Sequence, residues 1–193
     1  ETIDALEAVE VGDAIEGADA AFDGTYAALR PRRHRIEHAE LATDDQIERM
    51  ADLGIVASMQ PNFHRWARAG GLYETALGPD RAARSNRLRT VADAGVPLAF
   101  GSDGMPMDPL FGIEQAVTAP TEAQSLSVGA ALVAYTGGAA FAGFDEDRLG
   151  SIEVGKRADL VGLAESPWGD PEAIGEIDVE LTVVAGDVVH DGQ

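Results

Sequence analysis

Two short segments that end in metal-capable side chains constrain this fold more than any other feature of the sequence. They are I-E-H-A at residues 36–39 and A-F-G-S-D at residues 99–103, and His38 and Asp103 stand 65 positions apart. A (β/α)₈ barrel of roughly 250 residues uses about 30 residues for each strand and its helix. The spacing therefore fits two strands with one further strand between them. Because barrel enzymes keep their chemistry at the C-terminal ends of strands, the pair is a candidate half of a metal site.

The sequence around this pair alternates between strand-like and helix-like segments. Thr43 and Gln46 form a capping box, which predicts a helix that buries one apolar face and ends at Gly54. Such alternation calls for an α/β fold with a parallel sheet. Strands are expected at residues 34–37, 55–59 and 96–100, and a further helix is expected at residues 80–94.

The two ends of the chain differ from this central part. The sequence opens at Glu1 without an initiator methionine, so we expect the chain to be a piece of a longer protein. From about residue 144 the pattern becomes β-rich, which indicates a second unit that includes a hairpin turning at Gly186-Asp187. The expected helices are residues 2–11, 18–29, 109–117 and 127–135, and the expected β segments of the tail are residues 150–155, 158–163 and 181–189.

The charge of the chain argues against several classes of partner. The 193 residues carry a formal net charge of −20 and are 45% hydrophobic, so a core can form beneath an acidic surface. Such a surface repels nucleic acids and anionic membranes, and neither is expected as a partner. One lysine stands against thirteen arginines. We expect a halophilic source, because a Debye length of about 3 Å at 1 M salt leaves little self-repulsion.

The absence of cysteine excludes disulfides, cysteine-ligated zinc and thiol catalysis. No apolar run approaches the roughly 18 residues of a membrane span, and no signal peptide is recognisable. We therefore expect a cytoplasmic protein.

Three other motifs suggest different chemistry, and each lacks a feature that this chemistry needs. His34 and His38 are four residues apart, but Arg35 stands where an H-E-x-x-H metalloprotease needs glutamate. On a strand His34 would lie about 13 Å from His38, which favours a structural role. The glycine-rich residues 137–143 follow a helix pattern, whereas a dinucleotide loop follows a strand. Ser102 lacks the G-x-S-x-G surroundings of an esterase nucleophile.

Residues 62–79 are expected to form a long loop after Gln60 and Pro61. Long loops are uncommon unless they bind or cover something. Two interpretations stay open, because the aromatic side chains can line a substrate pocket or pack on one another. The candidate pocket residues are Gln60, His64, Trp66 and Tyr73.

Five segments in order resemble the amidohydrolase superfamily, and within it amidohydrolase family 3, the YtcJ-like metal-dependent hydrolases. The resemblance implies a (β/α)₈ barrel with a small β-sandwich. It implies that His38 ends the sixth strand as a metal ligand, and that Asp103 ends the eighth as metal ligand and general base. The segments are R-I-E-H-A-E (35–40), G-I-V-A-S-M-Q-P (54–61), D-A-G-V-P-L-A-F-G-S-D (93–103), D-P-L-F-G-I-E-Q-A-V-T (108–118) and L-G-S-I-E-V-G-K-R-A-D-L-V (149–161).

The same resemblance implies that other family elements would precede Glu1. These are a His-x-His on the first strand, a lysine on a middle strand, the histidine of the fifth strand and the first part of the sandwich. Residues 1–144 would then be a partial barrel with strands six to eight, and residues 145–193 the C-terminal part of the sandwich. Gly137-Gly138-Ala139 departs from the family, which has small residues with asparagine there.

The implied activity is metal-dependent hydrolysis of a C–N bond, amide or cyclic amide, in a small-molecule substrate. A divalent metal, zinc by preference, would activate water and Asp103 would accept its proton. We expect the chain alone to be inactive and to self-associate through open barrel edges. The alternatives are a non-catalytic half-barrel that binds or regulates, and a lone α/β binding module without metal.

Overall fold

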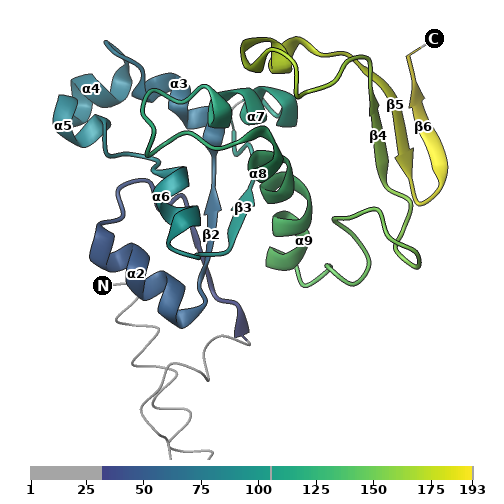
Figure 1. Cartoon of the computed structure of the whole chain (residues 1–193), viewed down its shortest axis with the longest axis horizontal. Coiled ribbons are helices and arrows are strands. Elements are labelled where there is room, and N and C mark those ends of the chain that lie inside the picture. Colours follow the sequence, from purple (N-terminus) through teal and green to yellow (C-terminus); the bar gives the residue numbers. More distant parts are fainter. Residues whose placement is uncertain (1–31, 105, 193) are drawn as a thin grey trace, which may run out of the picture.

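A three-stranded parallel sheet, sheet A, forms the centre of the molecule (Figure 1). The computed structural model describes residues 32–104 and 106–192, so the helices expected at residues 2–11 and 18–29 lie outside the described residues. The strand order is β1-β2-β3 and both pairs are parallel, which confirms the predicted order. The strands are β1 (Arg35–Glu37), β2 (Val56–Met59) and β3 (Leu98–Phe100).

Helix α2 (Asp44–Leu53) begins and ends as its sequence predicts. The Thr43 hydroxyl accepts the backbone N–H of Gln46 at 3.3 Å, and the Gln46 side chain accepts the N–H of Thr43 at 2.9 Å. Gly54 ends the helix in the left-handed conformation, at φ +66°. The buried face of the helix consists of Ile47, Met50 and Leu53.

We expect Thr43→Ala to lower the free energy of unfolding by about 1 kcal/mol, because the backbone N–H of Gln46 loses the hydroxyl that caps the start of α2. Urea denaturation of the 193-residue chain measures the change. Thr43→Ser keeps the hydroxyl and serves as the control. Equal midpoints for the alanine and serine variants would show that the capping box contributes nothing.

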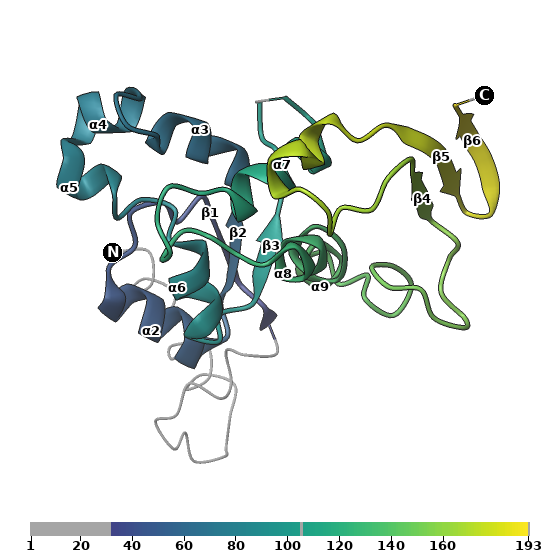
Figure 2. The same cartoon turned by 45° about the horizontal axis from the view of Figure 1, so that its top comes forward.

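The core lies on both faces of β2, which explains why this strand is apolar at every position except Ser58. Ala57 and Met59 face the main core, while Val56 packs with Ala99 and Ala142 on the opposite face. Helices α2, α6 (Leu88–Asp93) and α8 (Val128–Val133) contribute buried side chains to the main core, whereas α9 (Ala139–Ala142) contributes Ala142 to the opposite face. Figures 1 and 2 show α2 beside α6, and α8 and α9 next to β3.

The prediction of a long loop at residues 62–79 is wrong, because short helices occupy most of this segment. None exceeds six residues, so none repeats often enough to show a helical period in the sequence. The expected helix at residues 80–94 is also interrupted, since Asn86 adopts φ +48° before α6 begins. The helices are η3 (Pro61–Phe63), α3 (His64–Ala67), α4 (Leu72–Leu77) and α5 (Pro79–Ala82).

Helix α7 (Pro109–Val117) has the predicted bounds, and the Asp108 side chain caps it by accepting the N–H of Leu110 at 2.9 Å. Helix α8 starts as predicted but continues through η4 (Ala134–Gly138) into α9. The glycine-rich stretch that follows α8 is therefore mostly helical. The backbone of Gly138 packs directly on β3, where an added Cβ would overlap the Leu98 carbonyl oxygen.

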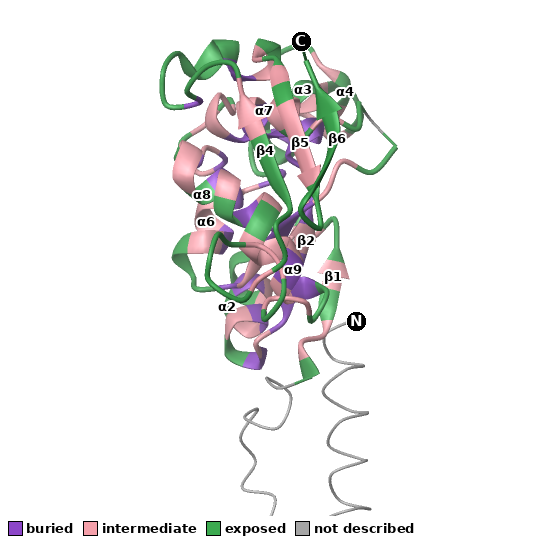
Figure 3. Ribbon diagram, turned by 90° about the vertical axis from the view of Figure 1, so that its right-hand side faces the viewer, coloured by how far each residue is buried: buried purple, intermediate pink, exposed green. Residues whose placement is uncertain are grey.

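The tail forms sheet B, an antiparallel sheet of β4 (Leu160–Leu163), β5 (Val179–Val184) and β6 (Asp187–Asp191). The predicted hairpin is confirmed, and it turns at Gly186 with φ +90°. Figure 3 shows sheet B largely exposed, in contrast to β2 and β3 of sheet A, which are mostly buried. The strand expected at residues 150–155 is wrong, because Gly150 and Gly155 both adopt positive φ and the segment turns.

One short helix joins the tail to the main core. Helix η5 (Pro171–Glu176) packs on α7, and the backbone N–H of Gly175 donates to Glu114 Oε2 at 3.0 Å. Ile174 is completely buried in the main core. Across residues 32–104 and 106–192, no helix is both long and apolar enough to span a membrane.

Candidate functional site

His38 and Asp103 lie at the same end of sheet A, just beyond the carboxyl ends of its two outer strands. His38 follows β1 directly, and its backbone N–H donates to Ser58 O at 2.8 Å, which continues the parallel ladder. Asp103 follows β3 by three residues. Gly101 N–H donates to Met59 O at 3.1 Å, so this ladder also continues past its strand. The central strand β2 separates the two candidates.

Both candidates have a left-handed backbone, with φ +69° at His38 and +53° at Asp103. Such φ values are uncommon outside glycine, and strained residues concentrate at functional sites. Both side chains reach solvent; that of His38 is 49% exposed. Asp103 Oδ1 accepts the N–H of Gly104 at 2.7 Å, and the cap of α7 is Asp108, so Asp103 is not a helix cap.

A ring of contacts supports the imidazole of His38. The Phe63 ring stacks on it with 6.0 Å between centroids and 11° between planes. Phe63 contacts Trp66, and Trp66 contacts Tyr73. The Tyr73 hydroxyl donates to Glu40 Oε2, and Glu40 Oε1 lies 3.9 Å from His38 Nδ1. Trp66 and Tyr73 thus pack within the aromatic group while each residue stays partly exposed.

Two members of this ring, Glu40 and Phe63, were not singled out from the sequence. Glu40 is the last residue of the R-I-E-H-A-E segment, so its closeness to His38 in the chain was the available signal. Burial, followed by the hydrogen bond to Glu40, raises the pKa of Tyr73 far above its ordinary value. The Tyr73 hydroxyl therefore stays protonated and keeps donating to the carboxylate at neutral pH.

His64 has a structural position and does not line an open pocket, contrary to its expected role. It is 0% exposed. Its Nδ1 lies 3.1 Å from Gln115 O and its Nε2 lies 3.0 Å from Asn86 O, so the ring links α7 to the turn before α6. Burial, the largest effect, lowers the pKa of His64 despite both carbonyl contacts. Sequence alone could not place these two carbonyls around the ring.

Gln60 lies between the two candidates, at the carboxyl end of β2. The residue is 6% exposed, and its Oε1 has no hydrogen-bond partner within residues 32–104 and 106–192. A buried acceptor without a partner costs about 1–3 kcal/mol. Such an atom marks a place where a further polar group would be stabilised.

The segment that carries Asp103 is held from behind by side chains that sequence reasoning missed. Asn62 is completely buried, and its Nδ2 donates to Pro106 O at 2.9 Å. The Tyr135 hydroxyl donates to Asn62 Oδ1 at 3.1 Å. These bonds link the loop after β3 to η3 and η4, and no local sequence pattern indicates them.

The side chains at this end of the sheet are of the types that bind zinc, but they are fewer than a zinc site needs. Imidazole nitrogen and carboxylate oxygen are both zinc ligands, and catalytic zinc sites use three protein ligands as a rule. In the described part of the chain no group of three or more His, Cys, Asp or Glu side chains could hold a metal ion. His38 and Asp103 therefore match part of such a ligand set.

Comparison with known sequences decides the family. A sequence profile with the description "Amidohydrolase family" matches residues 3–190. The chain belongs to the amidohydrolase family. The family predicted from the five sequence segments is confirmed.

Two curated relatives show how much of an amidohydrolase this chain spans. YtcJ of Bacillus subtilis (strain 168), whose name gives amidohydrolase as an inferred activity, is 31% identical over 192 residues, covering 90% of this chain and 36% of that protein. An imidazolonepropionase of Bacteroides thetaiotaomicron is 32% identical over 142 residues, covering 73% of this chain and 31% of that protein. The amidohydrolase chain thus spans about a third of these relatives.

A solved structure gives the same result. The crystal structure of an uncharacterized metal-dependent hydrolase from Pyrococcus furiosus superimposes with a TM-score of 0.57 and 35% identity. The match covers 65% of this chain and 27% of that one. The α/β fold of this amidohydrolase chain is therefore shared with a longer family member.

Proposed function

We propose that this chain is the C-terminal part of a metal-dependent hydrolase that cleaves C–N bonds of amides or cyclic amides in small molecules. The observation that carries the proposal is the parallel order β1-β2-β3, with His38 and Asp103 just past the ends of the outer strands. Family membership and the imidazolonepropionase relative support a hydrolase, and the Pyrococcus relative supports a metal.

In this proposal His38 and Asp103 hold a divalent metal, zinc by preference because the donors are nitrogen and oxygen. The bound metal supplies a Lewis acid that lowers the pKa of water toward about 7. Asp103 accepts the proton of the attacking water and delivers it to the leaving nitrogen, as a general base and then a general acid.

Glu40 and Tyr73 orient the imidazole of His38. A histidine that binds metal through one nitrogen is commonly held at the other by a carboxylate. Glu40 Oε1 lies 3.9 Å from His38 Nδ1, which leaves Nε2 for the metal. The stacked ring of Phe63 restricts rotation of the same imidazole.

Residues 1–144 would form strands six to eight of a barrel, and residues 145–193 the C-terminal part of a sandwich. Gln60, whose Oε1 has no partner among the described residues, and the partly exposed Trp66 and Tyr73 would border the substrate pocket. Two donors fall short of a catalytic zinc site. The remaining ligands would come from strands that the longer relatives contain, and the 193-residue chain alone would be inactive.

Zinc titration calorimetry tests this proposal. We expect weak binding by the 193-residue chain and tight binding, with amide hydrolysis, by a longer chain that contains the other barrel strands. In the longer chain His38→Ala should weaken zinc binding by more than the roughly 10–100-fold typical of a supporting residue, and Glu40→Gln by about tenfold. His190→Ala, which removes an exposed imidazole from β6, is the control.

Three results would contradict the proposal. Unchanged zinc affinity in His38→Ala would remove this residue from the metal site. Hydrolysis by the 193-residue chain with added zinc would show that the chain does not need further ligands. A longer chain that binds zinc but hydrolyses no amide or cyclic amide would favour a binding or regulatory role.

A further inference from the structure

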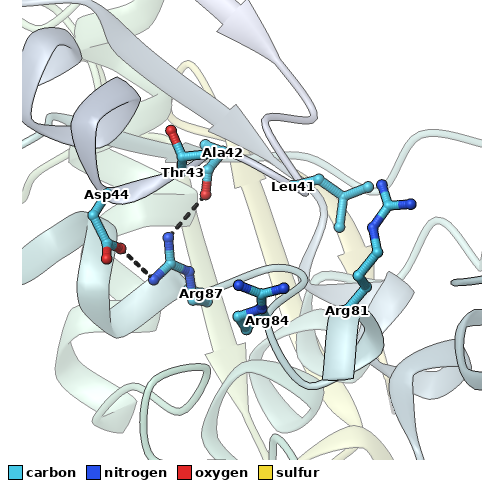
Figure 4. A pocket seen from close by; sticks show the side chains of 7 residues that line it. All are labelled: Leu41, Ala42, Thr43, Asp44, Arg81, Arg84 and Arg87. Carbon is cyan, nitrogen blue, oxygen red and sulfur yellow. Dashed lines mark hydrogen bonds and ion pairs between the residues drawn. The ribbon is translucent and has the colours of Figure 1, made fainter. Parts of the chain in front are cut away.

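A pocket of about 280 Å³ lies between the start of α2 and the segment that joins α5 to α6 (Figure 4). Three arginines, at positions 81, 84 and 87, face the chain at residues 41–44 across it. Neither His38 nor Asp103 lines this pocket. The lining residues are Leu41, Ala42, Thr43, Asp44, Arg81, Arg84 and Arg87.

One wall of the pocket comes from a basic stretch of an otherwise acidic sequence. Residues 65–89 contain six of the thirteen arginines and only two acidic residues, Glu74 and Asp80, although the chain carries −20 overall. At physiological salt the Debye length is about 8 Å, so distant acidic groups are screened while charges that line the pocket act on a ligand inside it. The local charge therefore decides which ions the pocket attracts.

One of the three arginines is neutralised within the fold. Arg87 Nη1 pairs with Asp44 Oδ1 at 2.6 Å and Nη2 donates to Ala42 O at 2.8 Å, as Figure 4 shows. The Arg87 side chain is 15% exposed and that of Asp44 is 78% exposed. Arg87 Nε is buried and has no acceptor in the described part of the chain.

The other two arginines keep most of their donors unused. Arg84 Nε donates to Asp80 O at 3.2 Å, which anchors the side chain and leaves the four terminal N–H groups. Arg81 makes no side-chain hydrogen bond or ion pair with any residue of 32–104 and 106–192. Two guanidinium groups on one pocket repel each other, and Asp44, already paired with Arg87, is the single carboxylate in the lining.

We infer that this pocket binds the oxyanion of a small molecule, a phosphate or a carboxylate, between Arg81 and Arg84. Planar guanidinium groups match such oxygen pairs through two parallel N–H···O bonds. The pocket volume of about 280 Å³ is several times the roughly 30 Å³ that one water occupies. The pocket therefore has room for more than the oxyanion group. Leu41 and Ala42 give one wall an apolar surface, so the anion carries a small apolar body. This inference does not depend on the proposed hydrolase activity.

Calorimetric titration of the 193-residue chain with inorganic phosphate tests the inference, with sodium chloride keeping the ionic strength constant. We expect saturable binding of one phosphate per chain. Arg81→Gln and Arg84→Gln should each weaken binding by about tenfold, the scale of a charge-assisted hydrogen bond. Both side chains are exposed, so the fold should tolerate either change.

Arg65→Gln is the matched control, because Arg65 is exposed in the same basic stretch and does not line the pocket. It should leave phosphate affinity within about twofold, since exposed charges at a distance are screened. Asp44→Asn should strengthen binding, because it removes the single negative charge from the pocket lining.

A parallel titration with propionate distinguishes the two sources of the oxyanion. Binding of either anion that is lost in Arg84→Gln supports the site and names its class. Absence of saturable binding by both anions would overturn the inference. So would equal weakening by Arg65→Gln and Arg84→Gln, which would reduce the effect to general charge, as would weaker binding in Asp44→Asn.

Discussion

Asp103→Asn is expected to lower kcat for amide hydrolysis by at least about 100-fold in a longer chain that contains the remaining barrel strands. General acid–base catalysis contributes about 10²–10⁴-fold, and a carboxamide can neither accept the proton of water nor return it to the leaving nitrogen. The amide keeps the size and one oxygen of the side chain. Steady-state kinetics should therefore show a large fall in kcat with a small change in KM.

Asp93→Asn is the control for this substitution. Asp93 is exposed at the end of α6 and lies outside the candidate site, so the same change of chemistry should leave kcat within about twofold. Zinc content, measured on the same samples, separates a lost proton acceptor from a lost ligand. An Asp103→Asn enzyme with wild-type kcat would remove Asp103 from the chemistry.

Gly138→Ala is expected to cause the largest loss of stability among the substitutions considered, about 1–3 kcal/mol or more. Gly138 has φ −65° and ψ −44°, which alanine adopts readily in a helix. Its Cβ, however, would overlap the backbone carbonyl oxygen of Leu98 on β3. A backbone atom within a sheet cannot rotate away, so η4 or β3 must shift.

Gly137→Ala is the matched neighbour for this test. A Cβ at Gly137 would meet only Gly150 O, at 3.6 Å, which is an ordinary contact. Alanine is favoured over glycine in helices by about 1 kcal/mol, so this variant should be neutral or slightly more stable. Chemical denaturation of both variants measures the difference, and equal stabilities would show that helix η4 does not approach β3 so closely.

The elements that were predicted correctly are those whose start, end or turn is determined by residues close together in the sequence. The capping box at Thr43 and Gln46 and the glycine after α2 act within a few residues, and the same is true of the turn at Gly186. The apolar run of β2 reports burial on both faces, which a parallel sheet requires. Local rules failed at residues 62–79, where helices of four to six residues leave no repeating pattern.

In the candidate site, too, the local features could be predicted from the sequence and the long-range contacts could not. The positions of His38 and Asp103 at strand ends follow from the short segments around them, and the parallel order of the strands is confirmed. Their supports do not follow, because Tyr73 reaches Glu40 across 33 positions and Tyr135 reaches Asn62 across 73. His64 looked like a pocket residue, yet two distant carbonyls enclose it.

The sequence by itself determined the family, the α/β class and the strand order, since these depend on short motifs and on spacing along the chain. Only the tertiary structure decided which side chains surround the ends of the strands. Phe63 stacks on His38, and Arg81, Arg84 and Arg87 line a pocket together with Asp44. Gln60 Oε1 is buried without a hydrogen-bond partner in the part of the chain that the structure describes. The physical reason is that packing and hydrogen bonds join groups by distance in space, which periodicity along the chain does not encode.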